Sequence, residues 1–458
     1  MVAGTSRVIG RLRRIGRADP LLDFIVRGSF ASLATRVVGI ALSYVSVVVL
    51  SRTLGLAGYG VYAIALAWAL VLVLPCRAGL DYAALRFASI YFERGDGARL
   101  KALVRFAALA MLFLSLLVGA GLYLLTIAGL TSIPPALAPG VALLIFPVAA
   151  LGLVAVLLRT ARLIAASQFY EQVLRPAILI LLLAAGAALG IRLSPANAMI
   201  LTAGSAGAAL VCGAIRVLQV LRSPVRPDYS PWREWIALSF PLLITTILQE
   251  LLNQLDIIIL GYLGTPAAAG LYSAAWRLAS LVGFGLAALT TSSGPLIASA
   301  HARRDIAEYA RIATITARFS LAASLALAVP LVIAGHHILR LFGPAFGEGY
   351  PALLILLAAG LVNGFTGVVA YFLTLTGKQV QALAIFACAV VISVTLNLLL
   401  IPRFSIVGAA VASASATLFW NGAMLFYVRR SFGIDASALG LPIRRSPSLA
   451  PPGEKVEP

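Results

Sequence analysis

The sequence predicts an all-α polytopic membrane protein of about twelve transmembrane helices, arranged as two parallel six-helix bundles around a central cavity. Hydrophobic residues make up 61% of the chain and charged residues only 11%, whereas soluble domains carry about 25% charged residues. A water-soluble fold cannot hide that much apolar surface, so the hydrocarbon interior of a membrane explains the composition.

The apolar residues gather in twelve runs, each long enough for a membrane helix of roughly 20 residues. These runs cover residues 29–51, 60–82, 102–128, 139–160, 174–191, 196–217, 237–261, 270–297, 312–334, 350–374, 380–401 and 406–428.

Basic residues alternate between rich and poor connections along these runs. The connection after the second run holds Arg86, Arg94, Arg99 and Lys101, whereas the connections predicted to face outward hold single arginines, which are Arg52, Arg192, Arg340 and Arg403. Because Lys and Arg accumulate on the cytoplasmic side, the pattern predicts a multi-pass protein of the bacterial inner membrane with both termini in the cytoplasm. The net charge of +19 is dispersed over these connections and does not form the single basic patch typical of nucleic-acid binding.

Composition divides the chain into five segments. These are a basic cytoplasmic leader (1–28), two six-helix bundles (29–217 and 237–430), a cytoplasmic linker between them (218–236) and a proline-containing tail expected to be disordered (431–458). A weak repeat supports two equivalent halves, because Gly60-Val61-Tyr62 returns about 210 residues later as Gly270-Leu271-Tyr272. A recurring tight glycine turn is the competing explanation.

Motifs for covalent chemistry are absent from the sequence. It contains no G-x-x-x-x-G-K-[ST] nucleotide loop, no H-E-x-x-H zinc motif and no G-x-S-x-G nucleophile motif. We therefore expect a transporter and not an enzyme, with no cofactor and no metal site.

Two arginines, Arg36 and Arg277, lie inside predicted spans of opposite halves. An arginine at the centre of a membrane helix costs about 2.5–3.5 kcal/mol, so it faces a cavity or a partner, or reaches the membrane surface by snorkelling. A guanidinium matches phosphate oxygens in a bidentate manner. We expect Arg36 and Arg277 to receive an anionic headgroup, and Arg318 is a further cavity candidate for which snorkelling is the stronger competitor.

The seventh predicted span is the most polar, with Gln249 followed by Glu250, Asn253, Gln254 and Asp256. Glu250, Asn253 and Gln254 are spaced i, i+3 and i+4 and so share one helix face. That face cannot lie against lipid and must meet a neighbouring helix or a wet cavity. Glu250, Asn253, Gln254 and Asp256 are therefore candidates for a polar cavity wall or ion coupling, and a dry interhelical network is the alternative.

Short motifs along nearly the whole chain support a family assignment. They are Leu50-Ser51-Arg52-Thr53-Leu54-Gly55 with Gly58-Tyr59-Gly60-Val61-Tyr62, Gly79-Leu80-Asp81, Leu260-Gly261-Tyr262-Leu263-Gly264, and Ile401-Pro402 with Gly408-Ala409-Ala410. In order and spacing the set resembles polysaccharide flippases, the Wzx-type O-antigen and exopolysaccharide transporters. Their superfamily also contains MATE multidrug exporters and lipid II flippases, in which two bundles form a V around a central cavity.

The resemblance extends to the two arginines. Arg36 is similar to a first-span arginine of lipid II flippases that is thought to engage the pyrophosphate, and Arg277 to a second-half cavity arginine there. The chain lacks two further C-terminal spans of those proteins, which argues against a peptidoglycan precursor as cargo.

The resemblance implies a transporter that flips an undecaprenyl-pyrophosphate-linked oligosaccharide from the cytoplasmic to the periplasmic leaflet for polysaccharide export. Implied partners are this lipid-linked substrate, membrane lipids and other polysaccharide-assembly proteins, and nucleic acid is not expected. A MATE-like drug or metabolite cation antiporter is one alternative, although Asp81 is the only acidic residue in the first six predicted spans. A membrane-embedded polysaccharide polymerase or ligase is the other, although the predicted outer connections are short.

Overall fold

The structure is a computed structural model that describes residues 20–190, 192–221, 225–284, 286, 303, 306–370, 373 and 378–440. All secondary-structure elements assigned within these ranges are helices, as predicted. Residues 1–19 of the predicted leader lie outside them, as does the tail beyond Gly440, whereas residues 20–28 of the leader belong to helix α2 (Pro20–Arg77).

Nine helices of the described chain are long and apolar enough to cross a membrane. Two of them are double length and change direction at a residue with non-helical backbone: α2 (Pro20–Arg77) at Gly55 and α15 (Gln379–Phe432) at Ser405. Each therefore holds two consecutive spans. Together with α10 (Pro266–Ser280), which covers the first part of the eighth predicted span, these helices cover part or all of each of the twelve predicted spans.

The chain divides into two compact units. The N-terminal unit comprises Met1–Leu54 and Trp68–Leu243, and the C-terminal unit comprises Gly55–Ala67 and Ile244–Pro458. In the predicted bundles, 29–217 and 237–430, the second and seventh spans each belong to one bundle. In the structure, each of these two spans is divided between the two units.

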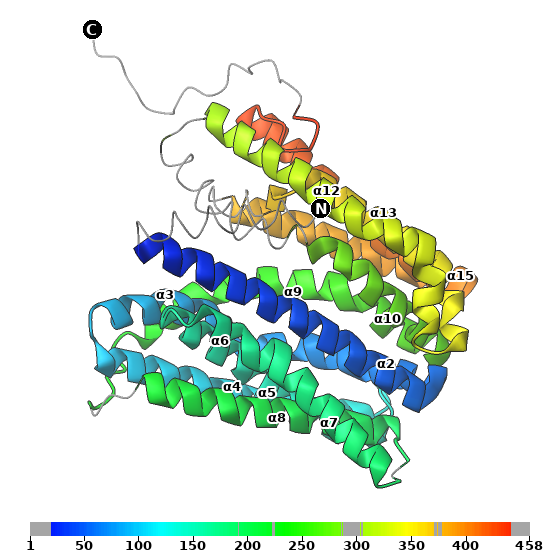
Figure 1. The fold of residues 1–458 in the computed structure, drawn as a ribbon, viewed down its shortest axis with the longest axis horizontal. Coiled ribbons are helices and arrows are strands. Elements are labelled where there is room, and N and C mark those ends of the chain that lie inside the picture. Colours follow the sequence, from blue (N-terminus) through cyan, green and yellow to red (C-terminus); the bar gives the residue numbers. More distant parts are fainter. Residues whose placement is uncertain are drawn as a thin grey trace, which may run out of the picture. The chain divides into compact units, whose positions relative to one another are not determined.

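In the N-terminal unit the central element is α5, which packs against α3, α4 and α8 (Figure 1). The helices are α3 (Leu80–Glu93), α4 (Gly97–Ile127), η1 (Pro135–Leu137), α5 (Ala138–Thr160), α6 (Ile164–Phe169), the π-helical turn η2 (Tyr170–Leu174), α7 (Arg175–Ala188) and α8 (Pro195–Val220). Leu144, Ile145 and Leu151 of α5 are fully buried, because this helix is apolar all round.

Two predicted boundaries in this unit are wrong. The second span ends at Arg77 and not at residue 82, because Ala78 and Gly79 take positive φ values of 48° and 67° and turn the chain into the amphipathic helix α3. The fifth span begins at Ile164 and not at residue 174. The π-helical turn lets the helix continue through Pro176, which lacks the N–H that a regular turn would use.

The C-terminal unit is organised around α13, which contacts α10, α12 and α15. Its helices are α9 (Trp232–Leu263, with the first twelve residues in the N-terminal unit), α10, η3 (Leu281–Gly283), α12 (Ile306–Arg340), η4 (Pro344–Gly349), α13 (Tyr350–Thr366) and α15.

The two glycines of the repeated motif meet within the C-terminal unit. A Cβ atom on Gly60 would lie 1.6 Å from the carbonyl oxygen of Pro266, and one on Gly270 would lie 2.7 Å from that of Leu56. Both positions need glycine because two backbones cross here in direct contact. The repeat therefore marks a helix crossing as well as a turn.

The first part of the predicted disordered tail is ordered. After α15 ends, the segment Gly433–Gly440 folds back against α12 and α13, with the Asp435 carboxylate 2.8 Å from the guanidinium of Arg429. Arg318 donates to the carbonyl oxygens of Ala438 and Leu439 at 2.9 and 3.3 Å. Ion pairing and buried apolar residues hold a segment whose composition alone predicted disorder.

Candidate functional site

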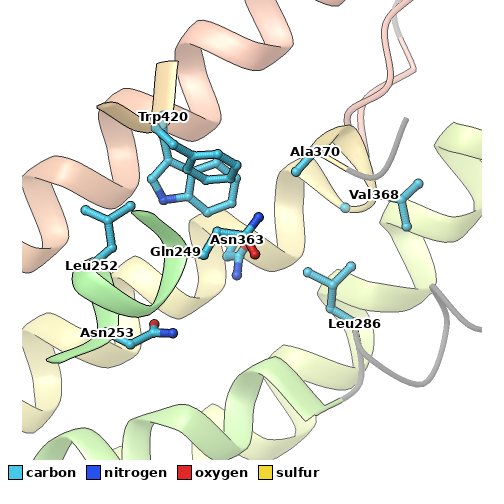
Figure 2. A pocket seen from close by; sticks show the side chains of 10 residues that line it. Gln249, Leu252, Asn253, Leu286, Asn363, Val368, Ala370 and Trp420 are labelled. Carbon is cyan, nitrogen blue, oxygen red and sulfur yellow. The ribbon is translucent and has the colours of Figure 1, made fainter. Parts of the chain in front are cut away.

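A cavity of about 370 Å³ lies within the C-terminal unit. Helix α9 contributes Gln249, Leu252 and Asn253, α13 contributes Asn363, and α15 contributes Phe386 and Trp420. Figure 2 shows Gln249 and Asn363 pointing into the same space that Trp420 borders. Of the described residues that line this cavity, none is charged.

The cavity wall combines amides with aromatic rings. The rings of Phe386 and Trp420 pack with centroids 5.4 Å apart and an interplanar angle of 44°. Each primary amide offers two donors and an acceptor. Three amides beside an aromatic surface suit a ligand with hydroxyl groups and an apolar face.

The polar residues of α9 separate onto two faces. Gln249 and Asn253 are exposed and line the cavity, whereas Gln254 is only 5% exposed and donates to the Glu250 carboxylate at 2.8 Å. Of the three residues predicted to share one face, Asn253 therefore lines the cavity beside Gln249, whereas Glu250 and Gln254 pair with each other.

Asp256 lies deeper, with a fully buried side chain. It accepts a hydrogen bond of 2.5 Å from the Tyr272 hydroxyl of α10 and one of 2.7 Å from the Asn397 amide of α15. Because a buried carboxyl group requires such donors, the three residues tie α9, α10 and α15 together. Asp256 lies on the same face of α9 as Gln249 and Asn253, further along the helix.

A second polar contact fixes α13 against α15. The Thr366 hydroxyl donates to the side-chain oxygen of Asn421, and the Asn421 amide in turn donates to the Thr417 carbonyl oxygen at 2.9 Å. Asn421 follows the cavity residue Trp420, and Thr366 lies one turn beyond Asn363. Both walls of the cavity are thus braced by buried hydrogen bonds.

The predicted cations occupy different surroundings. Arg36 is half-buried on α2 in the N-terminal unit, and three residues later Gly39 lets the helix approach η2 closely, since a Cβ there would lie 2.6 Å from the Gln172 carbonyl oxygen. Arg277 is half-buried on α10 in the C-terminal unit. Arg318 is exposed on α12 and holds the folded-back segment, as described above.

The N-terminal unit has a smaller charged cavity of about 240 Å³, lined in part by Arg77, Asp81, Arg159 and Glu171. Arg77 donates to the Val148 carbonyl oxygen at 3.1 Å and lies 3.9 Å from Asp81 across the α2–α3 turn. Gly152 leaves room for the guanidinium, because a Cβ there would lie 2.9 Å from its central carbon.

Several cavity residues were missed in the sequence. The apolar runs of the sequence contain the cavity residues as isolated positions, which are Asn363, Phe386 and Trp420. Asn397 lies 141 residues from its hydrogen-bond partner Asp256 in the sequence. The one available signal was the presence of Asn363 and Asn397 inside predicted spans, where polar side chains are usually functional or paired. In the described part of the chain no three His, Cys, Asp or Glu side chains form a group suited to a metal ion.

The fold is a multi-pass helical fold similar to those of MATE transporters and of a lipid II flippase. A multidrug resistance MATE family transporter of the MOP superfamily in its inward-facing conformation matches with a TM-score of 0.70 and 13% identity, covering 88% of this chain and 98% of its own. The lipid II flippase MurJ in an inward closed conformation matches with a TM-score of 0.66 and 13% identity over 88% and 87% of the two chains. At these identities the likeness concerns the fold alone.

The family follows from the sequence itself. Residues 25–301 match the family described as "Polysaccharide biosynthesis protein", which is more than half of the chain, and the chain belongs to that family. Residues 241–399 also match the family described as MatE. The predicted resemblance to polysaccharide flippases is thereby confirmed.

One relative is "Probable flippase AglR" of Haloferax volcanii, which is 32% identical over 170 residues. The aligned part covers 35% of this chain and 34% of that protein, so the chain matches about a third of the relative's length.

Proposed function

We propose that this protein flips an undecaprenyl-pyrophosphate-linked oligosaccharide from the cytoplasmic to the periplasmic leaflet of a bacterial inner membrane, without covalent chemistry. Membership of the polysaccharide biosynthesis family and the relative AglR support a lipid-linked sugar as cargo.

The observation that carries the proposal is the lining of the 370 Å³ cavity. A sugar ring presents hydroxyl groups around its edge and apolar C–H bonds on its faces. The amides of Gln249, Asn253 and Asn363 match the hydroxyls, and the ring of Trp420 matches the apolar face. A site built to hydrogen-bond hydroxyl groups rejects ligands that lack them, because its amides would lose their partners.

Arg36 and Arg277 are the proposed contacts for the pyrophosphate. Each is a half-buried arginine within an apolar stretch of its helix, where a permanent cation is costly unless it meets an anion or water. Glu250 and Asp256 are the proposed coupling carboxyls, and Gln254 orients Glu250 by its hydrogen bond. The membrane potential is a suitable energy source, since it contributes about 2.3 kcal/mol per charge per 100 mV.

Cells that lack their own flippase and produce this protein provide the test. It covers both the proposed sugar contacts in the cavity and the two proposed pyrophosphate contacts. At unchanged protein level, Trp420→Ala should strongly reduce surface polysaccharide, and the pair Arg36→Ala with Arg277→Ala should abolish it. Phe426→Ala and Arg430→Ala, which change residues on the exposed side of α15, should preserve it. Normal polymer from the cavity and arginine variants would refute the assignment.

The MatE match over residues 241–399 favours one alternative, a MATE-like cation antiporter. Binding of a cation would be expected to use a carboxylate, whereas the described lining of the C-terminal cavity offers amides and rings. Resistance to cationic dyes that is raised by overproduction and lost in Glu250→Gln would support this alternative over sugar transport.

A further inference from the structure

We propose that a groove at the predicted outer end of the N-terminal unit holds part of the isoprenoid chain of the lipid carrier, with the carrier phosphate at a basic rim. This inference rests on the proposed function, since it assumes a polyprenyl-linked substrate. The site differs from the amide-lined cavity and from the proposed positions of Arg36 and Arg277.

The groove has a volume of about 600 Å³ and is bordered by the end of α7, the start of α8 and Thr53 of α2. Leucine and isoleucine side chains dominate its walls, including Leu182, Leu193 and Ile200. Thr53 and Asn197 are the two polar side chains among its described lining residues. Such a lining suits a hydrocarbon chain and offers little to a sugar.

Small residues widen the groove along α7. Ala185, Gly186 and Ala187 line it, and a Cβ atom on Gly186 would meet no other atom within 4 Å. An isoprenoid chain carries a methyl branch on every unit and needs more lateral room than a straight acyl chain. The unfilled space beside Gly186 favours the branched chain.

Positive charge gathers at one end of the groove. Arg52 directly precedes the lining residue Thr53, Arg192 directly precedes Leu193, and both arginines are exposed. These are two of the four arginines predicted in outward connections, where basic residues are depleted. The positive end of the α8 dipole, which begins at Pro195, adds to the same rim. An apolar groove that ends in cations is complementary to a hydrocarbon chain that ends in phosphate.

Binding of undecaprenyl phosphate to the purified full-length protein, measured by native mass spectrometry, tests this site without transport. Dioleoyl phosphatidic acid carries the same phosphate monoester on straight acyl chains and serves as the competing lipid. We expect Gly186→Leu to weaken undecaprenyl phosphate binding about tenfold, the equivalent of excluding two methylene groups. The matched control is Gly204→Leu, at an exposed glycine of α8 that also faces open space but does not line the groove.

Equal binding of the two lipids, or unchanged undecaprenyl phosphate binding in Gly186→Leu, would overturn the proposal. If Gly186→Leu fails to fold, Ile200→Trp fills the same groove from α8 and decides the question. Loss of export in Trp420→Ala with unchanged binding in Gly186→Leu removes the groove and keeps the proposed function. Normal export in Trp420→Ala with weakened binding in Gly186→Leu removes the sugar cavity and keeps the lipid site.

Discussion

Tyr272→Phe removes a single oxygen atom from the buried network around Asp256. The Tyr272 hydroxyl donates to Asp256, and both side chains are fully buried. A phenylalanine fills the same space, so the change deletes one hydrogen bond to a buried carboxyl group and leaves the packing intact. Asp256 keeps its bond of 2.7 Å from Asn397.

The expected cost follows from two measured scales. Hydrogen bonds to charged groups contribute about 1.5–3 kcal/mol in soluble proteins, whereas those between membrane helices average about 0.6 and reach about 1.7 kcal/mol. The full burial of this pair places it where the scales overlap, at about 1.5 kcal/mol. For a unit the size of the C-terminal one, this lowers the melting temperature by about 3–6 °C.

Thermal unfolding of the purified protein in detergent, followed by tryptophan fluorescence, measures this shift. Tyr123→Phe is the control, because Tyr123 is 44% exposed on α4 of the other unit and should melt like the wild type. If Tyr272→Phe also melts like the wild type, the network does not brace the C-terminal unit and the reasoning fails.

Three further predictions concern stability. Measured by denaturation, Gly79→Ala should lower the free energy of unfolding more than Gly95→Ala does. Both glycines have positive φ, at which an alanine costs about 1–2 kcal/mol, but only the Cβ at position 79 would strike the Ser239 carbonyl oxygen, at 2.3 Å. Equal losses in the two variants would contradict the close contact. Asp435→Asn, which removes the ion pair with Arg429, should speed limited proteolysis within 433–440, and an unchanged cleavage pattern would show that the pair does not hold this segment. Hydrogen bonds from the backbone and side chain of Ser230, and then from Arg99, lower the pKa of Asp228. The stabilisation of the folded state by the Asp228 carboxylate is therefore fully present above a pH of about 4 and is lost as the pH falls through the lowered pKa. Asp228→Asn should have a lower melting temperature than the wild type at pH 7 and the same melting temperature in strong acid.

The sequence was informative where one physical quantity dominates. Apolar length located the spans, and the turn at Gly55, whose positive φ favours glycine, falls in the connection predicted between the first two of them. The helix α3 was missed, since its fourteen residues are too few to span a membrane and too polar to form an apolar run. The start of the fifth span at Ile164 was missed because nothing in Arg175-Pro176 distinguishes a helix start from a continued helix.

The site was harder to predict than the fold. Span seven stood out because its polar residues cluster on one short stretch, and Gln249 and Asn253 do line the cavity. Their partners Asn363 and Trp420 are single polar or aromatic residues in apolar helices, and only the packing of α9, α13 and α15 brings them together. The pairing of Asp256 with Asn397 depends on helix rotation, which hydropathy leaves undetermined.

The central claim is that the amide-lined cavity recognises the sugar during transfer of a lipid-linked oligosaccharide. Its most direct test is flipping of a fluorescent undecaprenyl-pyrophosphate oligosaccharide in proteoliposomes, scored by access of an added, membrane-impermeant glycosidase. The account predicts transfer by the wild type and a rate about tenfold lower in Trp420→Ala, the equivalent of one lost sugar contact of about 1.4 kcal/mol. Equal rates for the two proteins would contradict it.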